Sequence, residues 1–276
     1  MQFRHAIARM TVLKFPQGEV LFAMSFQLTL SDKLTSDVDL SSLPWNRVWD
    51  LSAGELEEVP IRIGKSSQRL SNVCQIERIS DNLSRLTIKN CTSRVHGIAV
   101  GLKAGEVIVN GDAGHRLAVD MTGGFLKIFG NVGDDLGGAS PGNNAGMRGG
   151  EIHVKGNAGN SVGARLRRGL IAISGNVGDD CGVDAIAGTI IVLGDVGTRA
   201  GMGMKRASLI VGSAGKIDAS RYDAAMKAMP TWLRVYFRSL ASKGFVIPAS
   251  WMNGPYQRFT GDQTGLCKAE IWTLCD

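Results

Sequence analysis

The sequence predicts an all-β protein, specifically a β-solenoid of glycine-rich repeats of about 19 residues, with flanking segments and a C-terminal helix as caps. Two observations predict this fold class. Glycine makes up 36 of 276 residues while aromatic residues are only 6%, a composition that favours tightly turned, narrowly packed β structure. A ten-residue glycine motif also recurs along the middle of the chain, and recurrence at a fixed period is typical of repeat architectures.

Five segments carry the repeat, and they read GEVIVNGDAG, GFLKIFGNVG, GEIHVKGNAG, GLIAISGNVG and GTIIVLGDVG. They begin at Gly105, Gly124, Gly150, Gly169 and Gly188, with spacings of 19, 26, 19 and 19 residues. A degenerate sixth copy, ASLIVGSAG, begins at Ala207. A unit this short cannot bury a core alone, so stacked copies must pair strand on strand.

Each repeat contains one short strand whose alternate residues are apolar, which puts them on one face of the strand. The two apolar columns are Val107, Leu126, Ile152, Ile171 and Ile190, and then Val109, Ile128, Val154, Ile173 and Val192. A mixed column between them is expected to face outward: Ile108, Lys127, His153, Ala172 and Ile191.

A turn follows each strand, formed by a glycine and then by Asn or Asp, as in Gly156-Asn157. These residue types tolerate positive φ best, so the turns are expected to use left-handed backbone. Further small or apolar columns predict inward positions: Ala113, Val132, Ala158, Val177 and Val196, and then Leu117, Leu136, Val162, Cys181 and Ala200.

The flanking segments are expected to cover the ends of the solenoid, because its terminal strands would otherwise leave backbone groups unpaired. Irregular copies at 85–90 (RLTIKN) and 59–65 (VPIRIGK) extend the repeats towards the N-terminus, and a helix over 219–243 breaks or restarts at Pro230. The predicted division is a disordered extension 1–23, an N-terminal flank 24–58, the solenoid 59–218, a helical cap 219–244 and an extended tail 245–276.

Composition argues against several classes of function. The net charge of +6 is mildly basic, but Lys/Arg blocks with interleaved aromatics are absent, so we expect no nucleic-acid partner. Five scattered cysteines without CxxC favour reduced thiols in the cytoplasm. Four histidines without metal-site spacing predict no metal site in this chain, and the lack of a long apolar run predicts no membrane segment.

The glycine motifs do not predict a nucleotide site, since phosphate loops need a helix directly after the glycines. Two non-repeating features are candidate contacts instead. An insertion in 137–150 carries Asn143, Asn144 and Arg148, and a basic cluster comprises Arg165, Arg167, Arg168, Arg199, Lys205 and Arg206. Each is either a solvated surface or a contact with a partner protein or an acidic ligand. No catalytic constellation is found in the sequence.

The repeats, and above all AGMRGGEIHVKGNAGNSVGA at 145–164, resemble the C subunit of formylmethanofuran dehydrogenase. That family is similar in its glycine-rich solenoid to the C-terminal domain of the large subunit of glutamate synthase. The resemblance covers about residues 60–215. The long insertion before Met147 distinguishes the chain from glutamate synthase.

The resemblance implies a non-catalytic scaffold subunit of a cytoplasmic complex. That complex would move a one-carbon formyl group between tetrahydromethanopterin, a methanofuran-type carrier and formate, as bacterial formyltransferase/hydrolase complexes do. It also implies an amidohydrolase-like partner, a formyltransferase partner, metals held only by other chains, and a carrier whose acidic tail would suit the basic cluster. The alternatives are the C subunit of an archaeal-type enzyme interconverting carbon dioxide and formylmethanofuran, or a glutamate-synthase-type structural module.

Overall fold

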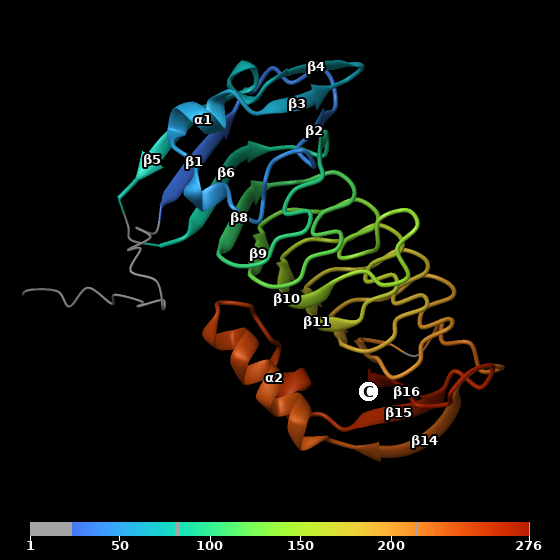
Figure 1. Ribbon diagram of the computed structural model, residues 1–276. Helices are drawn as coiled ribbons and strands as arrows, with labels where there is room; N and C mark the ends of the chain where they lie inside the picture. Colours follow the sequence, from blue (N-terminus) through green and yellow to red (C-terminus); the bar gives the residue numbers. More distant parts are fainter. Residues whose placement is uncertain (1–23, 81–82, 214, 276) are drawn as a thin grey trace, which may run out of the picture.

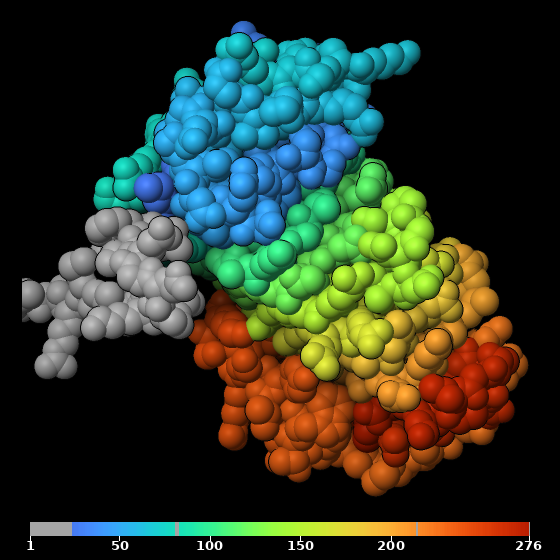
Figure 2. Space-filling model, in the orientation of Figure 1, coloured from blue at the N-terminus to red at the C-terminus, as the bar shows by residue number. Residues whose placement is uncertain are grey.

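The computed structural model describes residues 24–80, 83–213 and 215–275. The segment 1–23, for which disorder was expected, lies outside the described residues. The prediction of a mainly β protein is confirmed, because the described chain forms two sheets and few helices. Figure 1 shows the strands stacked along the molecule, and Figure 2 shows the successive segments as bands from the N-terminal to the C-terminal block.

The large sheet contains β1 (Ser25–Leu30), β5 (Cys74–Ile79), β6 (Arg85–Cys91), β8 (Glu106–Gly111), β9 (Phe125–Ile128), β10 (Arg148–Val154), β11 (Arg168–Ile173), β12 (Thr189–Val192), β13 (Ser208–Val211), β14 (Asp223–Ala228), β15 (Tyr256–Gly261) and β16 (Ala269–Leu274). The small sheet contains β2 (Val38–Asp39), β3 (Pro60–Ile63), β4 (Ser66–Arg69) and β7 (Val95–His96). The helices are α1 (Ala53–Glu57), α2 (Thr231–Ser242) and α3 (Ala249–Asn253), with 3-10 turns at Val48–Asp50 and Leu70–Asn72.

The large sheet has 12 strands in the order β14-β15-β16-β13-β12-β11-β10-β9-β8-β6-β1-β5. It is mixed, but the run from β1 through β6 and β8–β13 to β16 is parallel. Equivalent positions of the glycine repeats pair directly, as in Val107↔Leu126 and Ile171↔Ile190. The longer repeat keeps this register, with Ile152 opposite Leu126, so its extra residues lie in a loop.

At the N-terminal end, one of the two irregular copies is confirmed. Leu86 in β6 pairs with Val107, which makes 85–90 the strand next to the first regular repeat. The prediction for 59–65 is wrong, because β3 forms an antiparallel hairpin with β4 in the small sheet. Gly64, at φ +57°, occupies the turn of that hairpin. The next parallel position is taken by β1, from the predicted flank, with Phe26 opposite Leu86.

At the C-terminal end, the helix predicted over 219–243 begins only at Thr231, directly after Pro230. The preceding segment is the strand β14, paired antiparallel to β15. Alanine and methionine favour helix in isolation, but residue 229 precedes a proline, which disfavours helical backbone there. The tail is extended in β15 and β16 but also contains α3, and β16 lies parallel to β13.

The main hydrophobic core lies inside the stack of strands, as the periodicity predicts. Both apolar strand columns are buried, with Val107 and Ile190 at 0% exposure. The predicted inward positions after each turn are buried as well, and the residues from Ala113 to Val196 form isolated parallel bridges from one repeat to the next. Burial of these columns supplies the apolar contact that no single repeat can make.

The prediction that the mixed strand column faces solvent is wrong for His153, Ala172 and Ile191, which are at most 1% exposed. Ala172 and Ile191 belong to a second apolar cluster on the opposite face of the strands from the main core. Helix α2 covers this face with Leu233, Phe237 and Leu240, one stripe at helical spacing. The remaining buried members of the cluster are Leu170, Ile210, Phe245, Trp251, Tyr256 and Trp272. Figure 1 shows α2 beside the strands.

The turns depend on close approach between repeats more than on left-handed backbone. The prediction of left-handed backbone is wrong for Gly156 and Asn157, and among the five turn glycines only Gly111, at φ +115°, has a positive φ. A Cβ at Gly156 would lie 2.6 Å from both Gly130 O and Asn131 Oδ1 of the preceding repeat. The Asn side chain has its own role, since Asn131 Oδ1 accepts the backbone N–H of Asn157 at 2.9 Å. The same bond continues to Asn176 at 2.8 Å.

We therefore expect Gly156→Ala to lower the free energy of unfolding by about 1–3 kcal/mol, because the added methyl group forces two repeats apart. Equilibrium denaturation in urea measures the change. Gly54→Ala in α1 is the matched control, since nothing lies within 4 Å of its Cβ position. The control should leave stability unchanged or slightly raised. Equal effects of the two substitutions would contradict the close-approach argument.

Candidate functional site

Most of the basic cluster predicted from the sequence gathers at one edge of the stacked repeats. Arg148 and Arg168 are register partners on β10 and β11. The Arg167 N–H donates to Met147 O at 2.9 Å, which places it in the same layer. Two repeats further on, the N–H of Arg206 donates to Ile186 O at 3.1 Å, and Lys205 precedes it. We call these five residues, Arg148, Arg167, Arg168, Lys205 and Arg206, the basic corner.

The basic corner carries charge without internal compensation. All five side chains are exposed, and within the described part of the chain none of them makes an ion pair or a side-chain hydrogen bond. Arg199 behaves differently, because both oxygens of Asp180 accept from it at 2.7 and 2.6 Å. Uncompensated cations gathered at one edge of the stack create a positive field that attracts anions.

The other predicted contact residues lie in or against the inserted loop. Arg165 is not part of the basic corner, since its Nη1 donates to Asn143 O at 3.0 Å. The Asn143 side chain in turn donates from Nδ2 to Asp120 Oδ2 at 2.8 Å. Met147, at the end of the loop, is fully buried. Asn143 and Arg165 therefore hold the loop on the repeats, whereas Asn144 is exposed.

A groove beside the basic corner was not predicted from the sequence. One part, of about 630 Å³, is lined by Glu106, Gly124, Phe125, Lys127, Gly150, Glu151 and Lys243. A second part, of about 480 Å³, shares Gly150 and Glu151 with the first and adds Arg168, Gly169, Leu170, Gly188, Val235, Tyr236 and Ser239. One wall is the sheet and the other is α2 with the residue that follows it.

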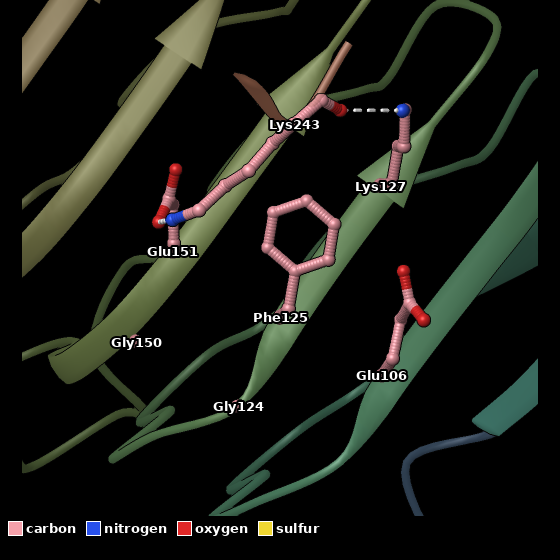
Figure 3. A pocket seen from close by; sticks show the side chains of 7 residues that line it. All are labelled: Glu106, Gly124, Phe125, Lys127, Gly150, Glu151 and Lys243. Atoms are coloured by element: carbon pink, nitrogen blue, oxygen red, sulfur yellow. Dashed lines mark hydrogen bonds and ion pairs between the residues drawn. The ribbon is translucent and has the colours of Figure 1, made fainter. Parts of the chain in front are cut away.

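Figure 3 shows how charges surround the aromatic ring of Phe125 in the larger part of the groove. Lys243 extends past the ring to Glu151, and Lys127 donates from Nζ to the backbone oxygen of Lys243 at 3.0 Å. Glu106, on the other side of the ring, accepts from Arg85 Nε at 2.6 Å. Glu151 and Glu106 are thus paired with cations, whereas Lys127 is held by a backbone carbonyl.

Glu151 joins the sheet to the C-terminal segment. Its Oε2 pairs with Lys243 Nζ, and its Oε1 lies 2.6 Å from Nε2 of the buried His153. Burial by itself raises the pKa of Glu151, but the hydrogen bonds with His153 and Lys243 outweigh it and hold the pKa below its ordinary value. The His153 ring packs edge-on against Phe125 and Phe245, and its Nδ1 is buried without a partner.

One sequence signal could have revealed this cluster. His153 is the one imidazole in a column that otherwise holds Ile108, Lys127, Ala172 and Ile191. A polar ring at a repeated strand position indicates a local partner. Lys243, which pairs with Glu151, is 92 residues away from it in sequence. The two side chains meet only because α2 folds back over the strands.

The remaining histidines within the described residues serve the turns. Nδ1 of His96 accepts the His115 N–H at 2.9 Å, and Nδ1 of His115 accepts the Asp134 N–H at 2.9 Å. A neutral ring that accepts at Nδ1 carries its proton on Nε2, which leaves neither nitrogen for a metal. Among the described residues, no group of three or more His, Cys, Asp or Glu could hold a metal ion. In the same residues, no helix is long and apolar enough to cross a membrane.

Glu151→Gln should lower the free energy of unfolding by about 1–2 kcal/mol at pH 7, because Lys243 and His153 lose a charged acceptor. A carboxylate with a lowered pKa stabilises the fold above its unfolded pKa, and this contribution disappears as the pH falls through the folded pKa. The difference in the free energy of unfolding between the variant and wild type should therefore shrink below pH 4.5. Denaturation curves measured from about pH 7 to about pH 3 test this. The control Glu77→Gln, on exposed β5, should show little difference, and a pH-independent gap would contradict the assignment.

No family model matches the chain, whereas curated relatives match over short stretches and a solved structure matches over most of the chain. The C subunit of the tungsten-containing formylmethanofuran dehydrogenase 2 of Methanococcus maripaludis strain S2 is 30% identical over 87 residues, 32% of each chain. Another Methanococcus maripaludis protein of that name is 29% identical over 92 residues, 33% of this chain and 34% of that protein. The matches thus span about a third of the length of these curated relatives.

The long match is structural. A chain in the X-ray crystal structure of the formyltransferase/hydrolase complex from Methylorubrum extorquens, in complex with methylofuran, is 29% identical to this chain with a TM-score of 0.73. The superposition covers 91% of this chain and 100% of that chain. The resemblance inferred from the glycine repeats is therefore confirmed: the chain is similar to the C subunits of formylmethanofuran dehydrogenases and to a chain of the Methylorubrum extorquens formyltransferase/hydrolase complex.

Proposed function

We propose that this chain is a non-catalytic scaffold subunit of a cytoplasmic complex that transfers a one-carbon formyl group between tetrahydromethanopterin, a methanofuran-type carrier and formate. The observation that carries the proposal is the structural match to a chain of a formyltransferase/hydrolase complex, which extends over 91% of this chain. The same superposition covers 100% of that chain.

In this proposal the parallel strands form a β-solenoid, and the flanks 24–58, 219–244 and 245–276 cover it. Support comes from the direct pairing of equivalent repeat positions, such as Ile171↔Ile190. Further support comes from the continuous core inside the stack. A rod of this kind is stiff because every repeat is held by its neighbours on both sides. Stiffness suits a protein that holds catalytic partners at a fixed distance.

The chemistry is assigned to other chains. We propose an amidohydrolase-like partner and a formyltransferase partner, with any metals held by those partners. Three acid–base groups in the described part of this chain already have partners: Glu151 is engaged by Lys243 and His153, and His96 and His115 belong to the turns. These contacts support a role for this chain outside the chemistry.

The basic corner is proposed as a contact for an acidic partner or for the acidic tail of the carrier. Its five unpaired cations lie on three repeats: Arg148 and Arg168 are on neighbouring strands, which are about 4.8 Å apart, and Arg206 lies two repeats beyond Arg168, with Ala187 between them. A chain of carboxylates lying along the corner could meet several of them at once. Asn144 is the exposed polar group of the neighbouring loop.

A second candidate is supported by the names of the curated relatives, which are dehydrogenase subunits. In that case the same scaffold would serve an archaeal-type complex interconverting carbon dioxide and formylmethanofuran. The two candidates differ in the partner chains and not in the role of this chain.

Purification from the native host under mild conditions tests the proposal. The chain should co-purify in stoichiometric amounts with an amidohydrolase-like and a formyltransferase partner, identified by mass spectrometry. A tungsten- or molybdenum-containing partner instead would establish the dehydrogenase candidate. Recovery of the chain as a lone monomer, with neither set of partners, would overturn the scaffold function.

The corner is tested by replacing Arg148, Arg167 and Arg168 with alanine. At low salt, the affinity for a tetra-γ-glutamate peptide should fall by about tenfold or more, because hydrogen bonds to charged groups are lost. Isothermal titration calorimetry measures the affinity, and native gels verify that the complex assembles. Lys65→Ala, in the exposed β3–β4 turn, is the control for simple loss of positive charge. An unchanged affinity in the triple variant would remove this contact from the proposal.

A further inference from the structure

From the groove between β11 and α2 we infer a carboxylate-binding site, formed by Arg168, Tyr236 and Ser239, for an aliphatic carboxylate on a flexible chain. The three residues line the same part of the groove, of about 480 Å³. Arg168 comes from the sheet, whereas Tyr236 and Ser239 come from one face of α2. The site therefore exists only when the C-terminal helix is folded back over the strands.

The polar groups that line this part of the groove are donors with free capacity. In the described chain the Arg168 guanidinium has no ion pair, and the Ser239 hydroxyl has no hydrogen-bond partner. The Tyr236 hydroxyl accepts from Thr189 Oγ1 at 3.5 Å, so its own proton remains available. A guanidinium and two hydroxyl donors together match the two oxygens of a carboxylate.

The one acid in the lining does not compete for these donors. Glu151 is already engaged on both oxygens, by Lys243 on Oε2 and by His153 on Oε1. A ligand that brought its own cation would find no free acidic side chain in this lining. The groove thus favours ligand groups that accept hydrogen bonds. It favours anionic groups most strongly, because Arg168 is positively charged.

The apolar part of the lining selects the chain that bears the carboxylate. Val235 is 62% exposed, and Leu170 lines the same part of the groove from the sheet side. Methylene groups beside the carboxylate would cover Val235 and gain apolar contact. Inorganic phosphate has no such groups, so it should bind more weakly than an aliphatic carboxylate.

The natural ligand follows from the proposed function, on which this part of the inference rests. An acidic carrier tail that lies along the basic corner would insert one glutamyl side chain into the groove, because Arg168 belongs to both. The groove would then set the position of the tail, while the other corner residues contribute charge alone.

Binding of glutarate to the full chain tests the site, with glutaramide and inorganic phosphate as comparison probes. Calorimetry at low salt should detect glutarate, with weaker binding of phosphate and none of glutaramide. Tyr236→Phe and Ser239→Ala each remove one hydroxyl and should weaken glutarate binding by about three- to tenfold. Arg168→Gln should weaken it by at least about tenfold. Lys65→Ala, in the distant β3–β4 turn, should bind as wild type does.

The hydroxyl variants separate the groove from simple charge attraction. If Tyr236→Phe and Ser239→Ala both bind glutarate like wild type, the groove is not the site and the inference is overturned, even where Arg168→Gln weakens binding. Phosphate binding as tightly as glutarate would also overturn it. The outcome is independent of the scaffold proposal, since recovery of a lone chain from the host would remove the partners and leave the glutarate result standing.

Discussion

The structure depends on the distance between successive repeats, which is so short that no side chain fits between their turns. The turn glycines lie against the backbone of the preceding repeat, and a Cβ at Gly130 would lie 2.4 Å from Gly111 O. This contact allows the strands to pair directly and the small apolar residues after each turn to bridge. It also lets each Asn or Asp oxygen reach the N–H of the next repeat. The narrow core, the ladders and the parallel register all follow from that spacing.

Each strand of the stack has two faces, and only one of them lies in the main hydrophobic core. The second face is apolar from β11 onward, and it is covered by α2 and the segments after it. The C-terminal segment that covers this face is joined to the strands by the ion pair between Lys243, after α2, and Glu151. A second connection is made by the carboxylate of Asp262, which is fully buried. Asp262 accepts from Gly203 N at 2.9 Å and from Arg221 at 2.8 Å, and these contacts, against the cost of burial, lower its pKa to about 2. The C-terminal segment is therefore part of the fold and not an appendage.

The groove and the basic corner arise from the same arrangement. Repetition places equivalent residues above one another, so arginines that recur at one position become a row of charge, as Arg148 and Arg168 do. The helix that covers the outer face then stops short of the edge and leaves a trough beside that row. The carboxylates in the larger part of the trough are paired with cations, whereas the cations of the corner have no partner among the described residues. This contrast is the reason for proposing a contact at the corner and a structural role for the charges in the larger part of the trough.

The sequence by itself determined the repeats, their register and their inner core. Glycines at 19-residue spacing and apolar residues at alternate positions have one consistent arrangement, in which equal positions pair. Local pattern could not assign the role of 59–65 or of 223–228, because hairpin and sheet partners there are decided by tertiary contacts. It also could not show that His153 is buried, or that Glu151 meets Lys243, since helix α2 folds back from a distant part of the chain. Strand periodicity reports which residues share a face, but only the tertiary structure decides what covers that face.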